Sequence, residues 1–163
     1  NEPIRGIFDM GRDLTDADIG MLNKEGINCL KSLPQRGIRV WGARTASSDP
    51  AWRHVPVRRI VSTVISSVER GLQWAVFENN DRFLWKQLVH QVTSFLLDLW
   101  QAGFFQGATP EEAFYVKCDE ETNPPEVQDA GQVIVECGVA PVRPAEFIVF
   151  KVDAEIEQRG AGE

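Results

Sequence analysis

The sequence has few cysteines and no long apolar run. No stretch approaches the roughly 20 apolar residues that a membrane-spanning helix needs, and no basic-then-apolar leader is present, so we expect no direct insertion into a membrane. Cys29, Cys118 and Cys137 lack the spacing of metal ligands. We interpret them as reduced, mostly buried thiols, and a Cys118–Cys137 disulfide between neighbouring strands is the alternative.

Motifs of common catalytic sites are also missing. The sequence contains no GxxxxGK[ST], no GxGxxG after a strand, no HExxH and no GxSxG. We interpret His90, on the polar side of a predicted helix, as solvated, and His54, in an Arg/Pro-rich loop where a helix starts, as a structural or interface residue. The acidic residues 119–121 lack the ligand alternation of a calcium loop. These absences predict no enzymatic activity, no metal site and no cofactor.

The charge is unevenly distributed. A formal net charge of −7 argues against nucleic acid as a partner. Positive charge nevertheless gathers between residues 36 and 59. There, Arg53, Arg58 and Arg59 are suited either to binding phosphate with their guanidinium forks or to facing carboxylates of the fold or of a partner. We favour the second interpretation.

Two long segments have the periodicity of amphipathic helices. The second covers residues 82–103, follows a turn at 78–81, and is apolar on more than one side, which indicates cover by several elements or by other subunits. A shorter helix is predicted over residues 16–25, and residues 109–112 match a capping box with proline at the first helical position. The first long helix is predicted from one apolar stripe: Val57, Ile60, Val61, Val64, Ile65, Val68 and Leu72.

The strand patterns are shorter. Residues 27–33 and 38–41 predict a hairpin, and residues 113–118 and 132–139 predict two further strands. The length fits one domain with an appended arm, and we expect the five tryptophans to lie mostly in its core. The sequence therefore predicts an α+β fold in which a small mixed β-sheet is packed by two long amphipathic helices.

The end of the chain is typical of a detached strand. Pro141 and Pro144 stand in the stretch APVRP. We interpret this stretch as a hinge, because proline is excluded from the central ladder of a sheet and favours an extended backbone in the residue before it. In residues 145–156, alternate side chains would point to opposite sides of a strand, and one of these two sides is almost wholly apolar. Such a strand pairs with its own sheet or completes that of a neighbour. We therefore divide the chain into a body, residues 1–139, and a hinge with a C-terminal arm, residues 140–163.

An ordered series of short motifs runs along the chain: residues 39–45 (RVWGART), 47–50 with 52–53, 57–59, 73–81 (QWAVFENND), 99–100 with Gly103, 107–114 (GATPEEAF), 116–119, 123–131 and 144–148. This series resembles the C-terminal domain of contractile tail sheath proteins, those of contractile phage tails and of phage-tail-like extracellular injection systems. Each motif alone is weak, but their order over residues 37–152 is specific. Asn79 departs from the pattern, where such sheaths often carry proline, and family members have more of the sheath body before Asn1.

The resemblance implies a structural subunit that polymerises around an inner tube and contracts to drive the tube through a target membrane. In similar sheaths, arms of neighbouring subunits add strands to each C-terminal-domain sheet. Arg53, Arg58 and Arg59 are candidates for facing the tube. Implied partners are further sheath subunits, the inner tube, and baseplate and cap proteins, assembled in the bacterial cytoplasm into a phage tail or a released phage-tail-like particle. The implied arm strand is Phe147, Ile148, Val149, Phe150, Lys151 and Val152.

Two other functions stay open on the sequence. One is a stand-alone α/β domain that binds a small ligand or is an enzyme, which would be a monomer or a small closed oligomer. The other is a baseplate or cap component that shares the sheath fold, which would form closed rings. A sheath subunit instead forms open helical polymers.

Overall fold

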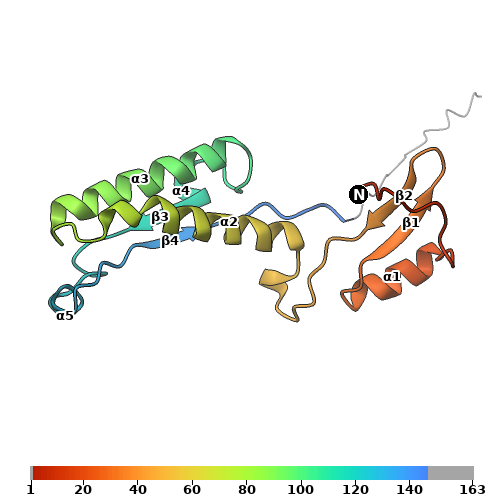
Figure 1. Cartoon of the computed structure of the whole chain (residues 1–163), viewed down its shortest axis with the longest axis horizontal. Coiled ribbons are helices and arrows are strands. Elements are labelled where there is room, and N and C mark those ends of the chain that lie inside the picture. The colour runs from red at the N-terminus through yellow and green to blue at the C-terminus, as the bar shows by residue number, and fades with distance from the viewer. Residues whose placement is uncertain (1, 147–163) are drawn as a thin grey trace, which may run out of the picture.

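The computed structural model describes residues 2–146 and shows an elongated α+β chain. Helix α1 (Asp16–Lys24) and strands β1 (Cys29–Leu33) and β2 (Gly37–Trp41) form one end (Figure 1). The other end holds two long helices and a second pair of strands. Residues 42–54 and residues 140–146 connect the two ends, and the second connection runs back toward β2. The predicted fold class is confirmed.

The first end is built as its sequence predicts. Thr15 caps α1 through a reciprocal pair of hydrogen bonds with Asp18, and the helix ends just before Gly26. Strands β1 and β2 pair antiparallel with Cys29 opposite Trp41. Residues 2–4 add a further extended segment beside β2, because Ile4 N–H donates to the Ile38 carbonyl at 3.0 Å.

The two long helices are α2 (Val55–Gly71) and α3 (Arg82–Gln101). Asp81 caps α3, with its carboxylate accepting from the backbone N–H groups of Phe83 and Leu84. The 3-10 helix η2 (Gln73–Ala75) lies in the connection between the two, and Phe77 follows with a positive φ of 70° and a fully exposed ring. Both predicted helices are confirmed to within two residues of their expected ends.

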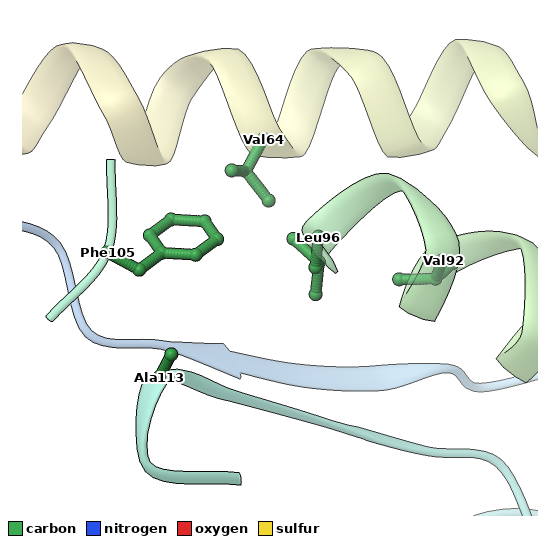
Figure 2. Close-up of a cluster of buried hydrophobic side chains, with 5 residues drawn as sticks. All are labelled: Val64, Val92, Leu96, Phe105 and Ala113. Atoms are coloured by element: carbon green, nitrogen blue, oxygen red, sulfur yellow. The ribbon is translucent and has the colours of Figure 1, made fainter. Parts of the chain in front are cut away.

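The main core lies between these helices and the segments after α3 (Figure 2). Val64 of α2 and Leu96 of α3 meet Phe105 and Ala113, and Leu96 is 0% exposed. A second cluster joins Leu84, Trp85 and Leu88 to Cys118. Burying such side chains contributes about 1.5–3 kcal/mol each. The helices are therefore held mainly by packing, as the β-branched content of α2 requires. Of the five tryptophans only Trp85 is buried, Trp100 packs against the main core, and Trp41 and Trp74 are exposed, so the expectation that the tryptophans lie mostly in the core is wrong.

Strands β3 (Phe114–Lys117) and β4 (Glu136–Val139) pair antiparallel and form a ribbon against α3. Phe114, Val116 and Val139 pack on the helix side of this ribbon. Within residues 2–146 the strands make two separate two-stranded antiparallel sheets rather than one mixed sheet. The predicted strand over 132–139 begins only at Glu136, because the backbone N–H and carbonyl of Ile134 are taken by the side chain of Asn123.

Two short helices connect these elements. In α4 (Pro110–Ala113) the predicted capping box does not form: Thr109 makes no side-chain capping bond, and Glu112 Oε2 instead accepts from Ala108 N–H at 2.8 Å. The helix α5 (Pro125–Asp129) agrees with the predicted proline-started turn. In the part of the chain that the structure describes, no helix is long and apolar enough to cross a membrane.

The cysteines agree with their sequence interpretation, and the acidic loop forms ion pairs with nearby basic side chains. Cys29 and Cys118 are buried free thiols, and Cys137 is free and exposed. Burial raises the pKa of the Cys118 thiol. Glu120 pairs with Arg82, and Glu121 pairs with Lys117. These carboxylates are therefore used in surface ion pairs.

Candidate assembly interface

The β3–β4 ribbon has backbone hydrogen-bonding groups at its outer edges that pair with no other described strand. Each of its two strands pairs only with the other among residues 2–146, so both outer edges are unpaired there. A two-stranded ribbon is of marginal stability alone, and an open edge is a template for a further strand. The α3 helix packs against one face of the ribbon.

The ribbon face away from the helices carries a single aromatic ring. Tyr115 stands opposite Gly138, and a Cβ added at Gly138 would lie 2.2 Å from the ring. The Tyr115 hydroxyl donates to Glu136 Oε1 at 2.7 Å, and this bond to a carboxylate raises the pKa of the phenol. The ring therefore lies flat across the neighbouring strand and covers the ribbon where a side chain at position 138 would otherwise stand.

The predicted hinge is held by backbone hydrogen bonds at its start. Pro141 pairs with Phe105 in an isolated antiparallel bridge. On either side of it, the Ala140 carbonyl accepts from Gln106 N–H at 2.7 Å, and Val142 N–H donates to the Phe104 carbonyl at 3.0 Å. Pro144 comes after this bridge and lines a cavity of about 830 Å³ with Val142 and Arg143. The chain thus leaves β4 along a fixed path.

That path ends at an ion pair that sequence reasoning missed. Arg44 donates from Nε to Glu146 Oε1 at 2.9 Å and from a terminal nitrogen to Oε2 at 2.6 Å. The two side chains are only 13% and 21% exposed. The hydrogen bonds from Arg44 hold the pKa of the Glu146 carboxyl below its ordinary value, and the same contact raises the pKa of Arg44.

His54 faces the same carboxylate. Arg44 and His54 lie opposite each other in a short antiparallel bridge, which directs both side chains to one side. The Nδ1 atom of His54 is buried, has no hydrogen-bond partner, and lies 3.7 Å from Glu146 Oε1. His54 thus stands at the start of α2, in agreement with its predicted structural role, and His90 is exposed as expected.

The three arginines proposed to face a tube lie in different surroundings. Arg58 stacks over the Trp52 ring, with its guanidinium carbon 5.1 Å from the ring centre. Arg59 lines the 830 Å³ cavity, and Arg53 is exposed and close enough to lower the pKa of Glu146 slightly. All three are exposed residues just before or within the first turns of α2.

The arm strand predicted from residues Phe147 to Val152 lies outside the described residues. Within residues 2–146 no group of three or more His, Cys, Asp or Glu side chains is placed to hold a metal ion. The described part of the candidate interface therefore consists of the open ribbon, the tethered hinge and the pair of Arg44 and Glu146.

Comparison with known proteins identifies the family to which this fold corresponds. The model of the phage tail sheath C-terminal domain matches residues 47–155. A protein named as a prophage major tail sheath protein, from Pseudomonas aeruginosa, is 31% identical over 159 residues, which cover 94% of this chain and 39% of that protein.

Solved structures agree. A chain in the baseplate structure of the anti-feeding prophage superposes with a TM-score of 0.90 at 34% identity, over 96% of this chain and 44% of that one. A chain of the PVC sheath complex, an extracellular contractile injection system in its contracted state, gives a TM-score of 0.84 at 36% identity, over 93% of this chain and 43% of that one. The chain thus spans less than half the length of each of these proteins. These matches confirm the resemblance that the ordered motifs predicted. The chain belongs to the phage tail sheath C-terminal domain family.

Proposed function

We propose that the protein is a structural subunit of a contractile tail sheath, which polymerises around an inner tube and contracts to drive that tube through a target membrane. The observation that carries the proposal is the β3–β4 ribbon, with both edges unpaired among the described residues in a chain of the sheath family. Strands added by neighbouring subunits would complete this ribbon and link the subunits through main-chain hydrogen bonds.

The added strand is the arm, residues 140–163, and the body is residues 1–139. The apolar side of the arm, with Ile148, Phe150 and Val152, would pack on the receiving subunit, while the backbone of the arm would continue the ladder of hydrogen bonds. The receiving ribbon is already braced by α3, so a third strand adds to a preformed template. Because the link is a ladder of backbone bonds, it can persist while the subunits reorient.

The energy for contraction would come from contacts between subunits. If contraction buries about 1,000 Å² of further apolar surface per subunit, it gains roughly 25 kcal/mol before ordering costs. The family is a structural one, and we propose that the protein has no catalytic role. Its partners would be further sheath subunits, the inner tube, and baseplate and cap proteins, assembled in the bacterial cytoplasm and carried in a phage tail or a released phage-tail-like particle.

Deletion of residues 147–163 from the full-length protein tests the proposal. We expect a folded subunit, with an unchanged far-ultraviolet circular dichroism spectrum, that no longer forms sheaths on co-expressed tubes in negative-stain images. A matched pair sharpens the test: serine at 148, 150 and 152 should abolish sheaths, whereas serine at 147 and 149, on the other side of the strand, should weaken them less. Long sheaths from the deletion variant would overturn the arm assignment, and closed rings from the intact protein would favour a baseplate or cap component.

A further inference from the structure

Glu146 occupies a site that several segments build together, which we call the Glu146 socket: Asn23, Asn28, Arg44 and His54. Every nitrogen of the Arg44 guanidinium has a partner, because the third one donates to the Asn23 carbonyl at 2.8 Å. Ion pairs on a solvated surface are rarely held by this many hydrogen bonds. The bidentate geometry fixes the direction of the carboxylate as well as its distance.

The backbone of Arg44 is held just as firmly. Asn28 Oδ1 accepts from Arg44 N–H at 2.8 Å, and Asn28 Nδ2 donates to the Arg44 carbonyl at 2.7 Å. Gly42 makes this approach possible, since a Cβ there would lie 2.6 Å from Asn28 Oδ1. The socket is therefore preorganised by α1, by the start of β1 and by the bridge to His54, independently of Glu146.

The socket contains one further nitrogen that faces the Glu146 carboxylate. His54 Nδ1 is a buried polar atom without a hydrogen-bond partner, 3.7 Å from Glu146 Oε1. Such an atom costs free energy unless a nearby group compensates for it. This nitrogen therefore faces the carboxylate of Glu146 beside the guanidinium of Arg44.

The socket and the hinge together hold both ends of one short segment. Residues 140–142 are bonded to residues 104–106 at one end, and Glu146 is bonded to Arg44 at the other. We infer that the Glu146 socket anchors the C-terminal segment to the α1–β1–β2 end of the subunit and thereby sets the point from which the arm departs. Arg44 and Glu146 are positioning residues, and the pivot of the arm follows Glu146 rather than lying at Pro141 and Pro144. This inference rests on the proposed function.

The anchoring itself can be measured in the unassembled full-length subunit. Spin labels at Ala145→Cys and Ser62→Cys, both exposed positions, report the distance between the segment and α2 by pulsed electron resonance; Cys137→Ser removes the exposed native thiol. We expect a narrow distance distribution, broadening in Arg44→Glu and in Glu146→Gln, and narrowing again in the charge-swapped pair Arg44→Glu with Glu146→Arg. Arg36→Glu, an exposed arginine on the β1–β2 turn, is the matched control.

The consequence for assembly is measured separately, by counting sheathed tubes. We expect Arg44→Glu to lose about tenfold, the range expected when a charged hydrogen-bonded partner is removed, and the charge swap to recover part of that loss. An unchanged distance distribution in both single variants overturns the anchor. A broadened distribution with normal sheath formation overturns its role in assembly and leaves the sheath function standing. If Arg44→Glu does not fold, Glu146→Gln decides both points.

Discussion

The side chain of Asn123 forms two hydrogen bonds with the backbone of Ile134, as a paired strand residue would. Asn123 Oδ1 accepts from Ile134 N–H at 2.6 Å, and Asn123 Nδ2 donates to the Ile134 carbonyl at 3.0 Å. Asn123 is 0% exposed. This amide therefore ties the loop after β3 to the segment before β4 and closes the far end of the ribbon.

Replacing Asn123 by alanine should lower the free energy of unfolding by about 1–3 kcal/mol, because two partly buried backbone groups of Ile134 lose their partner and the buried amide leaves a gap. Urea denaturation followed by tryptophan fluorescence measures the change. Asn79→Ala, at an exposed position in the α2–α3 connection, is the control and should change stability by less than about 0.5 kcal/mol. Equal effects of the two substitutions would contradict the role of the amide.

The ion pair of Arg44 and Glu146 should make stability depend on pH in the acid range. Arg44 lowers the pKa of Glu146 in the folded state, so the folded protein binds this proton less readily than the unfolded chain. The stabilisation is complete above the ordinary carboxyl pKa of about 4.3 and is lost as the pH falls through the lowered folded value.

Comparing wild type with Glu146→Gln isolates this contribution. At neutral pH we expect the variant to be less stable by about 1 kcal/mol, since solvent screens a partly exposed pair. The difference should shrink to zero at pH values below the folded pKa. Denaturation curves collected from neutral pH down to acid check this, and a difference that grows toward low pH would contradict it.

Phe77 should be replaceable with a gain in stability. Its φ of 70° is unfavourable for a residue with a Cβ, and its ring is fully exposed and packs on nothing in the described chain. Phe77→Gly should therefore stabilise the isolated domain by about 1 kcal/mol, the cost of the left-handed conformation less the added freedom of the unfolded chain. Phe77→Ala keeps the Cβ and should give no such gain. Thermal unfolding of both variants distinguishes strain from the loss of the ring.

Charge reversal at Arg53 and Arg59 should loosen sheath from tube without unfolding the subunit. Exposed charges suit a releasable contact because salt screens them. We expect the double glutamate variant to co-sediment less with tubes, and the wild-type contact to weaken as ionic strength rises. Arg58→Glu is a less clean variant, since it also removes the stacking on Trp52. Unchanged co-sedimentation would make this surface structural only.

The local elements of the fold could be predicted because their signals are local. The stripe of α2, the Asp81 cap of α3 and the Thr15 box of α1 each depend on residues a few positions apart. The length of β4 could not, because it is set by a side chain from another loop. Nothing in the alternation of residues 132–139 shows that Asn123 competes for Ile134.

The socket was missed for the same reason at longer range. Arg44 and Glu146 are 102 residues apart, and each looks like a solvated surface charge in its own sequence context. The proline pattern did locate where the chain leaves the ribbon, but the tether at Phe105 and the ion pair at Glu146 are tertiary contacts. Asn28, which holds the Arg44 backbone, is itself 16 residues away, so no local sequence signal points to the socket.

Tyr115, lying across Gly138 on the uncovered ribbon face, is the sole tyrosine of this chain. A fluorinated tyrosine placed there yields one resonance from this region, and the phenol is over half exposed, so its chemical shift responds to whatever approaches that side. The ring thus provides a native spectroscopic reporter on the ribbon to whose outer edges a neighbour's strand is proposed to add, readable without labelling any other part of the domain.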